Sequence, residues 1–456
     1  MRDTGPDPVC LIKRTVNNRE VSEFRLSPGH RGVAALHDAG LWDQVIEEVD
    51  GRRIRIGTTW LTDFASCNYL GFDLDPQIQA AAGEQIARWG THPSWSRMLG
   101  SPRLYPDLED RLAELLGAEA VLTMPTISQV HLSVLPALVG EGTILLDQRA
   151  HRTIYDGSVY ARARGATVRR FRHEDLDHLA DLLREAPSDR PVVVCMDGVN
   201  SMTGNAPDVP AFAELCRRHG AYLYIDDAHG FGVIGERRSD ETSPYGARGN
   251  AVVRHTGGSY ERVILIGGMS KAYSSMMAFV ACDASTKRYL KITAPPYLYS
   301  GPVPTASLAV ALAGLDVNAE RGDALRARLY GLTKRVLDHL ASLGVTTANR
   351  SVFPLIEVPL RDPELLQPVA RALQARGIYL TLAPYPGVPR DEVGFRIQLT
   401  AANTDAEVDD LLGTLSWLHT EFDPAGTPMR RRIPAQRGPE ADGASTQWRQ
   451  RSGSPA

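Results

Sequence analysis

The sequence predicts an α/β protein in which a large domain with a mainly parallel sheet precedes a smaller α+β domain. Short apolar runs alternate with helical patterns from about residue 61 to 300, which is typical of crossover units and a parallel sheet. Several runs are apolar on both faces, as expected of strands covered by helices on both sides. From about 301 to 422 the pattern is mostly helical, with two candidate strands among the helices.

Seven apolar runs account for the expected sheet of the large domain. They are Ala120–Met124, Thr143–Asp147, Ala166–Arg170, Pro191–Met196, Ala221–Ile225, Val263–Ile266 and Met277–Ala281. Helices are expected between them at Asp107–Leu116, Leu176–Glu185 and Val209–His219. The smaller domain is expected to contain helices at Thr305–Arg321, Ala324–Leu343, Glu364–Gly377 and Asp405–His419, with strands at Val352–Val358 and Val393–Leu399.

The two ends of the chain differ from this pattern. Residues 1–60 are weakly periodic and are interpreted as an N-terminal arm with one helix at Val33–Val49 and a Gly/Arg-rich turn at Gly51–Ile56. Residues 423–456 are rich in Pro, Gly, Arg and Ser and contain few apolar residues, so they are predicted to form a disordered tail.

Composition restricts the kind of partner. The 456 residues include 50 Lys and Arg against 54 Asp and Glu, a net charge of −4, so neither nucleic acid nor a membrane is expected as the main partner. The five cysteines form no CxxC pair, which disfavours a zinc site and a disulfide framework. Because the start lacks the apolar run of a signal peptide and no run is long enough to span a membrane, we expect a cytoplasmic protein.

One literal match to a dinucleotide fingerprint is misleading. The GxGxxG pattern at residues 230–235 follows an expected strand, but the fingerprint must open a helix whose N-terminus receives the pyrophosphate. The residues that follow, 236–244, are polar and rich in turn formers. A nicotinamide cofactor is therefore disfavoured.

A second pattern resembles a metal motif. His173 and His178 flank acidic residues as in HExxH, but with one residue too many. A spacing of five places the two rings on different sides of a helix, so they do not share a metal ion. A helix N-terminus with acidic residues in its first turn explains the pattern better.

Two strand ends bring chemically useful side chains together. The strand at Ala221–Ile225 leads into Asp226 and His229, and the strand at Val263–Ile266 leads into Lys271. Ligands of open parallel sheets bind outside the carboxyl ends of the strands, so these three side chains are expected in one crevice. A lysine that forms a Schiff base and an aspartate that pairs with a pyridinium nitrogen are what pyridoxal phosphate (PLP) chemistry requires.

From about residue 60 to 420 the chain resembles the α-oxoamine synthase family of fold-type I PLP-dependent enzymes. The matching segments, in the family's order, are Ser66–Gly71, the region of His151, Gly198–Gly204, Asp226–Gly235, Ser270–Ala272, Tyr299–Ser300 and Phe395–Ala402. The resemblance implies a fold-type I architecture, PLP as cofactor, an amino acid and an acyl thioester (acyl-CoA or acyl carrier protein) as substrates, and a homodimer with a shared active site.

The resemblance also implies roles for individual residues. Lys271 matches the lysine that binds the cofactor and removes the substrate α-proton, Asp226 the partner of the pyridinium, and His229 the ligand of the ring oxygen. His151 matches the histidine that stacks on the ring. The remaining matches are Ser201 near the ring oxygen, Thr126 and Ile127 at the phosphate, Ser270 beside the lysine, Ser300 reaching the phosphate of the other subunit, and Asn68 and Arg396 at the substrate carboxylate.

Several positions depart from the family pattern. Gly268 stands where the family usually has a threonine that binds phosphate, and Gly301 replaces the threonine of a Ser-Thr pair. Gly394 replaces the first arginine of an Arg-x-Arg sequence, and Gly387 replaces a threonine. Pro125, Tyr105 and Asn403 are further departures. The chain is therefore interpreted as a diverged member.

The activity expected from the resemblance is a decarboxylative condensation of a small amino acid with an acyl thioester, giving an α-amino ketone. Two alternatives stay open at this point. The same site is compatible with other PLP chemistry, such as aldol-type cleavage or aminotransfer. The altered phosphate contacts are also compatible with a non-catalytic homologue that serves as a scaffold.

Overall fold

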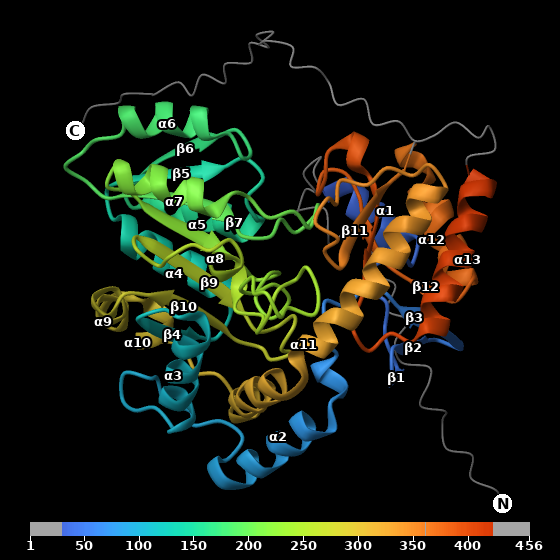
Figure 1. Cartoon of the computed structure of the whole chain (residues 1–456), viewed down its shortest axis with the longest axis horizontal. Coiled ribbons are helices and arrows are strands. Elements are labelled where there is room, and N and C mark those ends of the chain that lie inside the picture. The colour runs from blue at the N-terminus through green and yellow to red at the C-terminus, as the bar shows by residue number, and fades with distance from the viewer. Residues whose placement is uncertain (1–29, 361, 423–456) are drawn as a thin grey trace, which may run out of the picture.

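The computed structural model describes residues 30–360 and 362–422; the predicted tail and the first 29 residues of the predicted arm lie outside this range. A large sheet with helices on both faces occupies one side of the molecule, and a smaller helical part occupies the other (Figure 1). The long helix α11 (Thr305–Ser342) runs between the two. This confirms the predicted α/β class.

The large sheet has seven strands in the order β4-β10-β9-β8-β7-β5-β6. Strands β5 to β9 are parallel to one another, and β10 is antiparallel to both β4 and β9. The strands are β4 (Ala120–Met124), β5 (Thr143–Asp147), β6 (Thr167–Phe171), β7 (Val192–Asp197), β8 (Tyr222–Asp226), β9 (Val263–Gly268) and β10 (Ala278–Cys282). The predicted seven-stranded, mainly parallel sheet is therefore confirmed.

Two hydrophobic clusters cover the faces of this sheet. Leu223 and Ile225 of β8 pack in one cluster, whereas Tyr224 packs in the other, because successive side chains of a strand point to opposite faces. The second cluster also contains Val130 and Val134 of a helix. The helices of the large domain are α3 (Leu104–Leu116), α4 (Ile127–Val139), α5 (Arg152–Ala163), α6 (Leu176–Glu185), α7 (Val209–Arg218), α8 (Ala251–His255), α9 (Ala284–Thr293) and α10 (Pro295–Leu298).

The smaller part is built on strands from both ends of the described chain. Its three-stranded antiparallel sheet has the order β11-β14-β13, with β11 (Leu355–Pro359), β13 (Thr381–Ala383) and β14 (Gly394–Gln398). A second sheet joins β1 (Glu48–Asp50), β2 (Arg53–Ile56) and β3 (Thr59–Asp63) to β12 (Ile378–Tyr379). Residues 48–63 thus pair with the C-terminal region, while the predicted domain limits at 60, 300 and 422 stay predictions.

The remaining helices are short, apart from α2 and α13. They are α1 (Arg31–Asp38), η3 (Phe72–Leu74), α2 (Pro76–Trp89), η4 (Pro363–Leu365), α12 (Leu366–Ala375), η5 (Arg390–Glu392) and α13 (Asp405–Phe422). Asp75 begins α2 by accepting the backbone N–H groups of Gln77 and Ile78, and Pro76 stands at the first helical position.

Three predicted helices were wrong in extent. The helix expected at Val33–Val49 ends at Asp38, because Gly40 adopts φ +69° and its N–H donates to the carbonyl of His37. The helices expected on either side of Gly322 form one continuous α11. A Cβ at position 322 would lie 2.4 Å from the Asn318 side chain, so this glycine permits the close approach of Asn318 and Arg326 rather than ending the helix.

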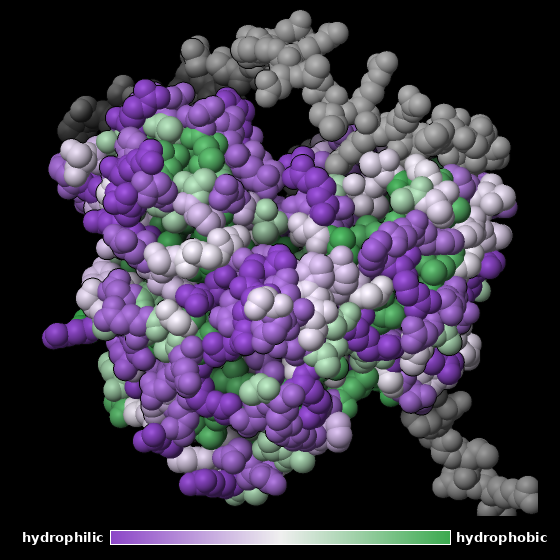
Figure 2. Space-filling view, in the orientation of Figure 1, coloured by the Kyte–Doolittle hydropathy of each residue, from purple (hydrophilic) through white to green (hydrophobic). Residues whose placement is uncertain are grey.

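The surface agrees with the balanced composition. The face in Figure 2 is mostly hydrophilic, with smaller hydrophobic patches between the polar side chains. No helix within residues 30–360 and 362–422 is long and apolar enough to cross a membrane.

Candidate active site

Three acidic strand ends define the crevice at the carboxyl edge of the sheet. Asp147, Asp197 and Asp226 end β5, β7 and β8, and Asp197 and Asp226 are register partners on neighbouring strands. All three are buried, at 2 %, 9 % and 6 % exposure. Burial and the nearby Asp226 carboxylate raise the pKa of Asp197 well above its ordinary value. The crevice therefore brings three buried carboxyl groups together, and this proximity favours the protonated form of Asp197.

Asp226 is held by two hydrogen bonds. Its Oδ2 lies 2.9 Å from Nε2 of His131, and its Oδ1 accepts the backbone N–H of Ala228 at 3.0 Å. Burial by itself raises the pKa of Asp226, but the His131 hydrogen bond and the Lys271 charge outweigh it and lower this pKa below its ordinary value. Asp226 is therefore an anion inside the protein.

His229 lies at the same edge, with 7 % exposure. Its Nδ1 is 2.8 Å from the hydroxyl of Tyr69, which is completely buried. Burial and the positive charges of Lys271 and Arg396 lower the pKa of His229 well below its ordinary value. The ring is therefore neutral, and its Nδ1 is engaged by the Tyr69 hydroxyl, which leaves Nε2 as the nitrogen that can face a ligand.

Lys271 lies in the loop after β9, where its charge lowers the pKa of Asp226 and of His229. The N–H of Ser274 donates to the Lys271 carbonyl at 2.9 Å, and the Ser274 hydroxyl donates to Oδ1 of Asn68 at 3.2 Å. Nδ2 of Asn68 donates to Asp73 at 2.9 Å. Asn68, predicted to bind the substrate carboxylate, is thus tied to the lysine loop and keeps one amide hydrogen free of these contacts.

His151 caps α5 at the entrance to the crevice. Its backbone N–H donates to Asp197 at 2.9 Å, and its Nδ1 lies 2.8 Å from the Thr153 hydroxyl. Although part of the ring surface is accessible, protein atoms crowd it, and this desolvation lowers its pKa; Asp226 acts in the opposite direction. The neutral ring is therefore the main form near pH 7.

Arg396 projects from β14 of the smaller part toward this group. Its Nη1 donates to the carbonyl of Ser201 at 2.7 Å, and its Nε is buried without a hydrogen-bond partner among the described residues. Its charge lowers the pKa of both His151 and His229. The two parts of the fold thus meet at this arginine, with Ser201 beside it.

The N-terminus of α4 forms the opposite wall. Thr126 caps the helix by accepting the N–H of Gln129 at 3.3 Å, so the first N–H groups, beginning with Ile127, point out of the helix. A Cβ at Gly268 would lie 3.5 Å from Ile127 and 3.3 Å from Ala228. Because Gly268 has no side chain, the N-terminus of α4 stays accessible to an anion.

Two predicted residues lie at the margin of the crevice. Ser270 is exposed next to Lys271. Ser300 is half-buried, and its hydroxyl donates to the carbonyl of Gly301 at 3.1 Å. Their predicted roles stay predictions. His173 pairs with Asp147 at 3.0 Å, and no group of three or more potential ligands is arranged for a metal within residues 30–360 and 362–422.

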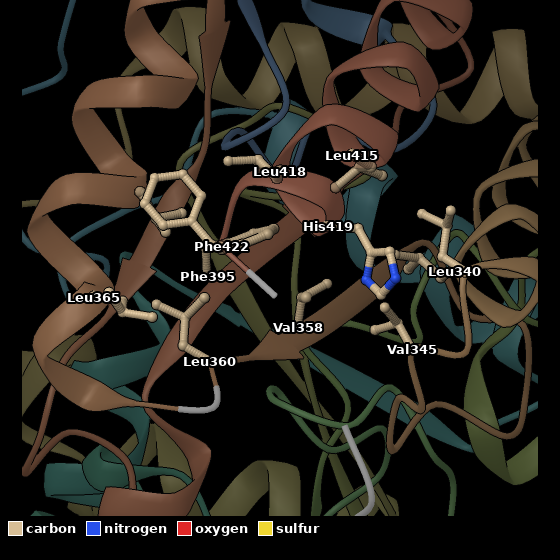
Figure 3. Close-up of a pocket in the computed structure, with 12 residues that line it drawn as sticks. Leu340, Val345, Val358, Leu360, Leu365, Phe395, Leu415, Leu418, His419 and Phe422 are labelled. Atoms are coloured by element: carbon tan, nitrogen blue, oxygen red, sulfur yellow. The ribbon is translucent and has the colours of Figure 1, made fainter. Parts of the chain in front are cut away.

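Two cavities differ sharply in character. A cavity of about 500 Å³ beside the crevice is lined by Ser201, Met202, Arg149, Arg152, Arg170 and residues 386–389, among others. A small apolar cavity of about 50 Å³ lies in the smaller part and is lined by Leu, Val and Phe side chains together with His419 (Figure 3). The 500 Å³ cavity adjoins the crevice that holds the predicted catalytic residues. The 50 Å³ cavity is lined by none of these residues.

Sequence reasoning missed His131, Tyr69 and Asp197 as members of this site. Asp197 ends an apolar strand in the same way as Asp226, so the same pattern could have predicted it as a residue of the site. Tyr69 lies in a segment that was already singled out. His131 has no such signal, because a single histidine inside an apolar helix is typical of a core position.

The comparisons with known proteins agree with this geometry. Residues 60–415 match the family described as aminotransferase class I and II. The 8-amino-7-oxononanoate synthase of Chromohalobacter salexigens is 36 % identical over 79 % of this chain and 89 % of its own. The serine palmitoyltransferase of Caulobacter vibrioides is 32 % identical over 80 % of this chain and 86 % of its own.

A solved serine palmitoyltransferase from S. paucimobilis, with a bound PLP–myriocin aldimine, shares the fold. It superposes with a TM-score of 0.77 at 23 % identity, covering 86 % of this chain and 96 % of that one. The fold and the strand-end site define a fold-type I transferase. Within that class, the chain belongs to the α-oxoamine synthase family and is an enzyme of that type.

Proposed function

We propose that this protein binds PLP and catalyses the decarboxylative condensation of a small amino acid with an acyl thioester, releasing an α-amino ketone. The observation that carries the proposal is the convergence of the Lys271 cation and the buried Asp226 anion at neighbouring strand ends. Bound PLP supplies an electron sink for the negative charge that develops at the amino acid Cα.

The residues fit this cofactor. Asp226 is a buried anion beside the Lys271 cation, as a site for a protonated pyridine nitrogen requires. The helix terminus at Ile127, kept open by Gly268, suits a phosphate. His229 turns its Nε2 away from Tyr69, which suits a ring oxygen.

The side chains of the site then have separate roles. Asp226 keeps the proton on the pyridine nitrogen, and Lys271 removes the proton from Cα of the amino acid. Arg396 and Asn68 hold the amino acid carboxylate. His151, neutral near pH 7, donates a hydrogen bond to the oxygen that becomes negative when the thioester carbonyl is attacked.

The 500 Å³ cavity is the proposed entry path of the thioester. Three arginines line it, and the guanidiniums of Arg152 and Arg170 lie 5.3 and 6.0 Å from the ring of Tyr155. Both CoA and the carrier-bound pantetheine arm carry phosphate, which arginine binds well. These residues support a phosphorylated thioester as the second substrate.

A homodimer is part of the proposal. Large apolar side chains are exposed around Ser300 and the loop before α3, including Tyr299 at 79 %, Leu99 at 75 % and Met98 at 56 %. Exposed groups of this size mark association surfaces. A second copy that covers them would place its Ser300 near the cofactor phosphate of its partner.

Mass spectrometry of the products from glycine, alanine and serine, each with acyl-CoA and with acyl carrier protein, tests the proposal. An α-amino ketone that requires both substrates supports it. Aminotransfer or aldol cleavage would instead give products without a thioester. A purified protein that takes up no PLP would favour the scaffold alternative.

A further inference from the structure

We propose that His131 is a positioning residue that fixes the Asp226 carboxylate against the pyridine nitrogen of the cofactor, acting from the far side of Asp226 together with Tyr224. The inference deepens the proposed function and rests on its PLP site. His131 itself contacts neither substrate nor cofactor in this assignment; it acts through Asp226.

The three side chains form one hydrogen-bonded row. Nε2 of His131 lies 2.9 Å from Oδ2 of Asp226, and Nδ1 of His131 lies 2.8 Å from the hydroxyl of Tyr224. Tyr224 and Asp226 are two residues apart on β8, so their side chains point to the same face of the sheet. That face is covered by α4, which carries His131.

The donors and acceptors of the row have one consistent order. An ionised carboxylate only accepts, so Nε2 of His131 carries a proton and donates it to Asp226. In a neutral ring Nδ1 is then the acceptor, and the Tyr224 hydroxyl donates to it. Tyr224 stays protonated, since burial raises its pKa well above the ordinary value. Every polar atom of the His131 ring is thereby used.

Burial makes this row effective. His131 and Tyr224 are both completely buried, and Asp226 is 6 % exposed. Hydrogen bonds are stronger where water is excluded, and a buried carboxylate without partners would tend to take up a proton. The His131 hydrogen bond is the largest contribution that keeps the pKa of Asp226 low.

The geometry distinguishes this role from that of an ordinary core histidine. A core residue needs its nitrogens satisfied by any neighbour, such as a backbone carbonyl. Both nitrogens of His131 instead bond side chains, and one of these is the single anion in contact with the expected pyridinium. The remaining oxygen of Asp226, Oδ1, is fixed by Ala228, so the carboxylate is held on both sides.

Variants of the holoenzyme test the proposal through readouts that need no thioester. These are the PLP dissociation constant, the visible absorption of the bound cofactor, and the exchange of the glycine α-proton in D₂O followed by NMR. We expect His131→Leu to weaken PLP binding and to slow exchange by about tenfold each, and Tyr224→Phe by about threefold, as the loss of one buried hydrogen bond predicts. His131→Gln, which retains a donor, should recover most of the loss.

Ser133→Ala is the matched control. Ser133 is a buried polar residue of the same helix whose hydroxyl donates to the carbonyl of Gln129, away from Asp226. It should leave all three readouts unchanged. If His131→Leu does not fold, the comparison of Tyr224→Phe with Ser133→Ala decides; equal effects of these two variants overturn the proposal.

A cofactor analogue separates positioning from packing. In 1-deaza-PLP a carbon replaces the ring nitrogen, so Asp226 has no proton to hold. Wild type and His131→Leu should then exchange the α-proton equally slowly. A tenfold difference that persists with the analogue would show a packing effect and overturn the proposal. Absence of thioester-dependent product with normal α-proton exchange would instead contradict the proposed function alone.

Discussion

The hydroxyl of Tyr69 lies 2.8 Å from Nδ1 of His229, and both side chains are buried. The two residues are 160 positions apart in the chain, so the contact joins the segment before η3 to the loop after β8. Because Tyr69 engages Nδ1, it fixes the orientation of the His229 ring and leaves Nε2 to face the site. This relationship leads to the first prediction.

Tyr69→Phe should weaken the site without unfolding the protein. Losing one buried hydrogen bond costs about 1 kcal/mol, so kcat/KM and PLP affinity should each fall about fivefold. Steady-state kinetics and cofactor titration measure both. Tyr245→Phe is the control, since its hydroxyl bonds the carbonyl of Val352 at 2.6 Å, outside the site; equal kinetic losses in the two variants would contradict the role given to Tyr69.

Asp227 makes stability depend on pH. Burial raises its pKa to about 8, far above the value in an unfolded chain. The folded state therefore binds the extra proton, and the stability this contributes is full below about pH 4 and is lost as pH rises through about 8. Asp227→Asn should flatten the decline in Tm between about pH 4 and 8. An unchanged slope would show that another group controls it.

The 500 Å³ cavity lined by Arg149, Arg152 and Arg170 should determine the affinity of the protein for the acyl thioester. Arg152→Ala and Arg170→Ala should each raise the KM of the acyl thioester about fivefold and leave the KM of the amino acid unchanged, as expected when one phosphate contact is removed. Arg162→Ala, an exposed residue of the same helix α5 that does not line the cavity, serves as control. Equal changes in both KM values would place the thioester elsewhere.

Gly394 explains one departure from the family pattern. A Cβ there would lie 2.1 Å from the carbonyl oxygen of Val358 on the paired strand β11, so no arginine fits without a shift of the backbone. Gly394→Ala should destabilise the protein by about 2–3 kcal/mol in denaturant unfolding. Gly413→Ala, with open space around it in α13, should be neutral or stabilising by up to about 1 kcal/mol. Similar stabilities of the two variants would contradict this account.

The sequence patterns located the strands well, since each strand of the large sheet overlaps a predicted apolar run; Ala120–Met124 and Thr143–Asp147 match to the residue. Helix ends were harder. Two helices were predicted on either side of Gly322, whereas the structure has one continuous α11 in which the side chains of Asn318 and Arg326 lie against this glycine.

In the site, too, some residues can be predicted from the local sequence and others cannot. Asp226 and Lys271 follow apolar strands, and the parallel topology alone brings such strand ends together. The contact of His131 with Asp226 and the contact of Ser274 with Asn68 each join segments distant in the chain. No local spacing encodes those contacts, so only the structure reveals them.

The central claim is tested most directly by CO₂ release. Purified protein loaded with PLP is incubated with a small amino acid, with an acyl thioester, and with both. The account predicts CO₂ in equal amount to the free thiol, only when both are present, and none with Lys271→Ala. Release of CO₂ without the thioester, or full activity of Lys271→Ala, would contradict it.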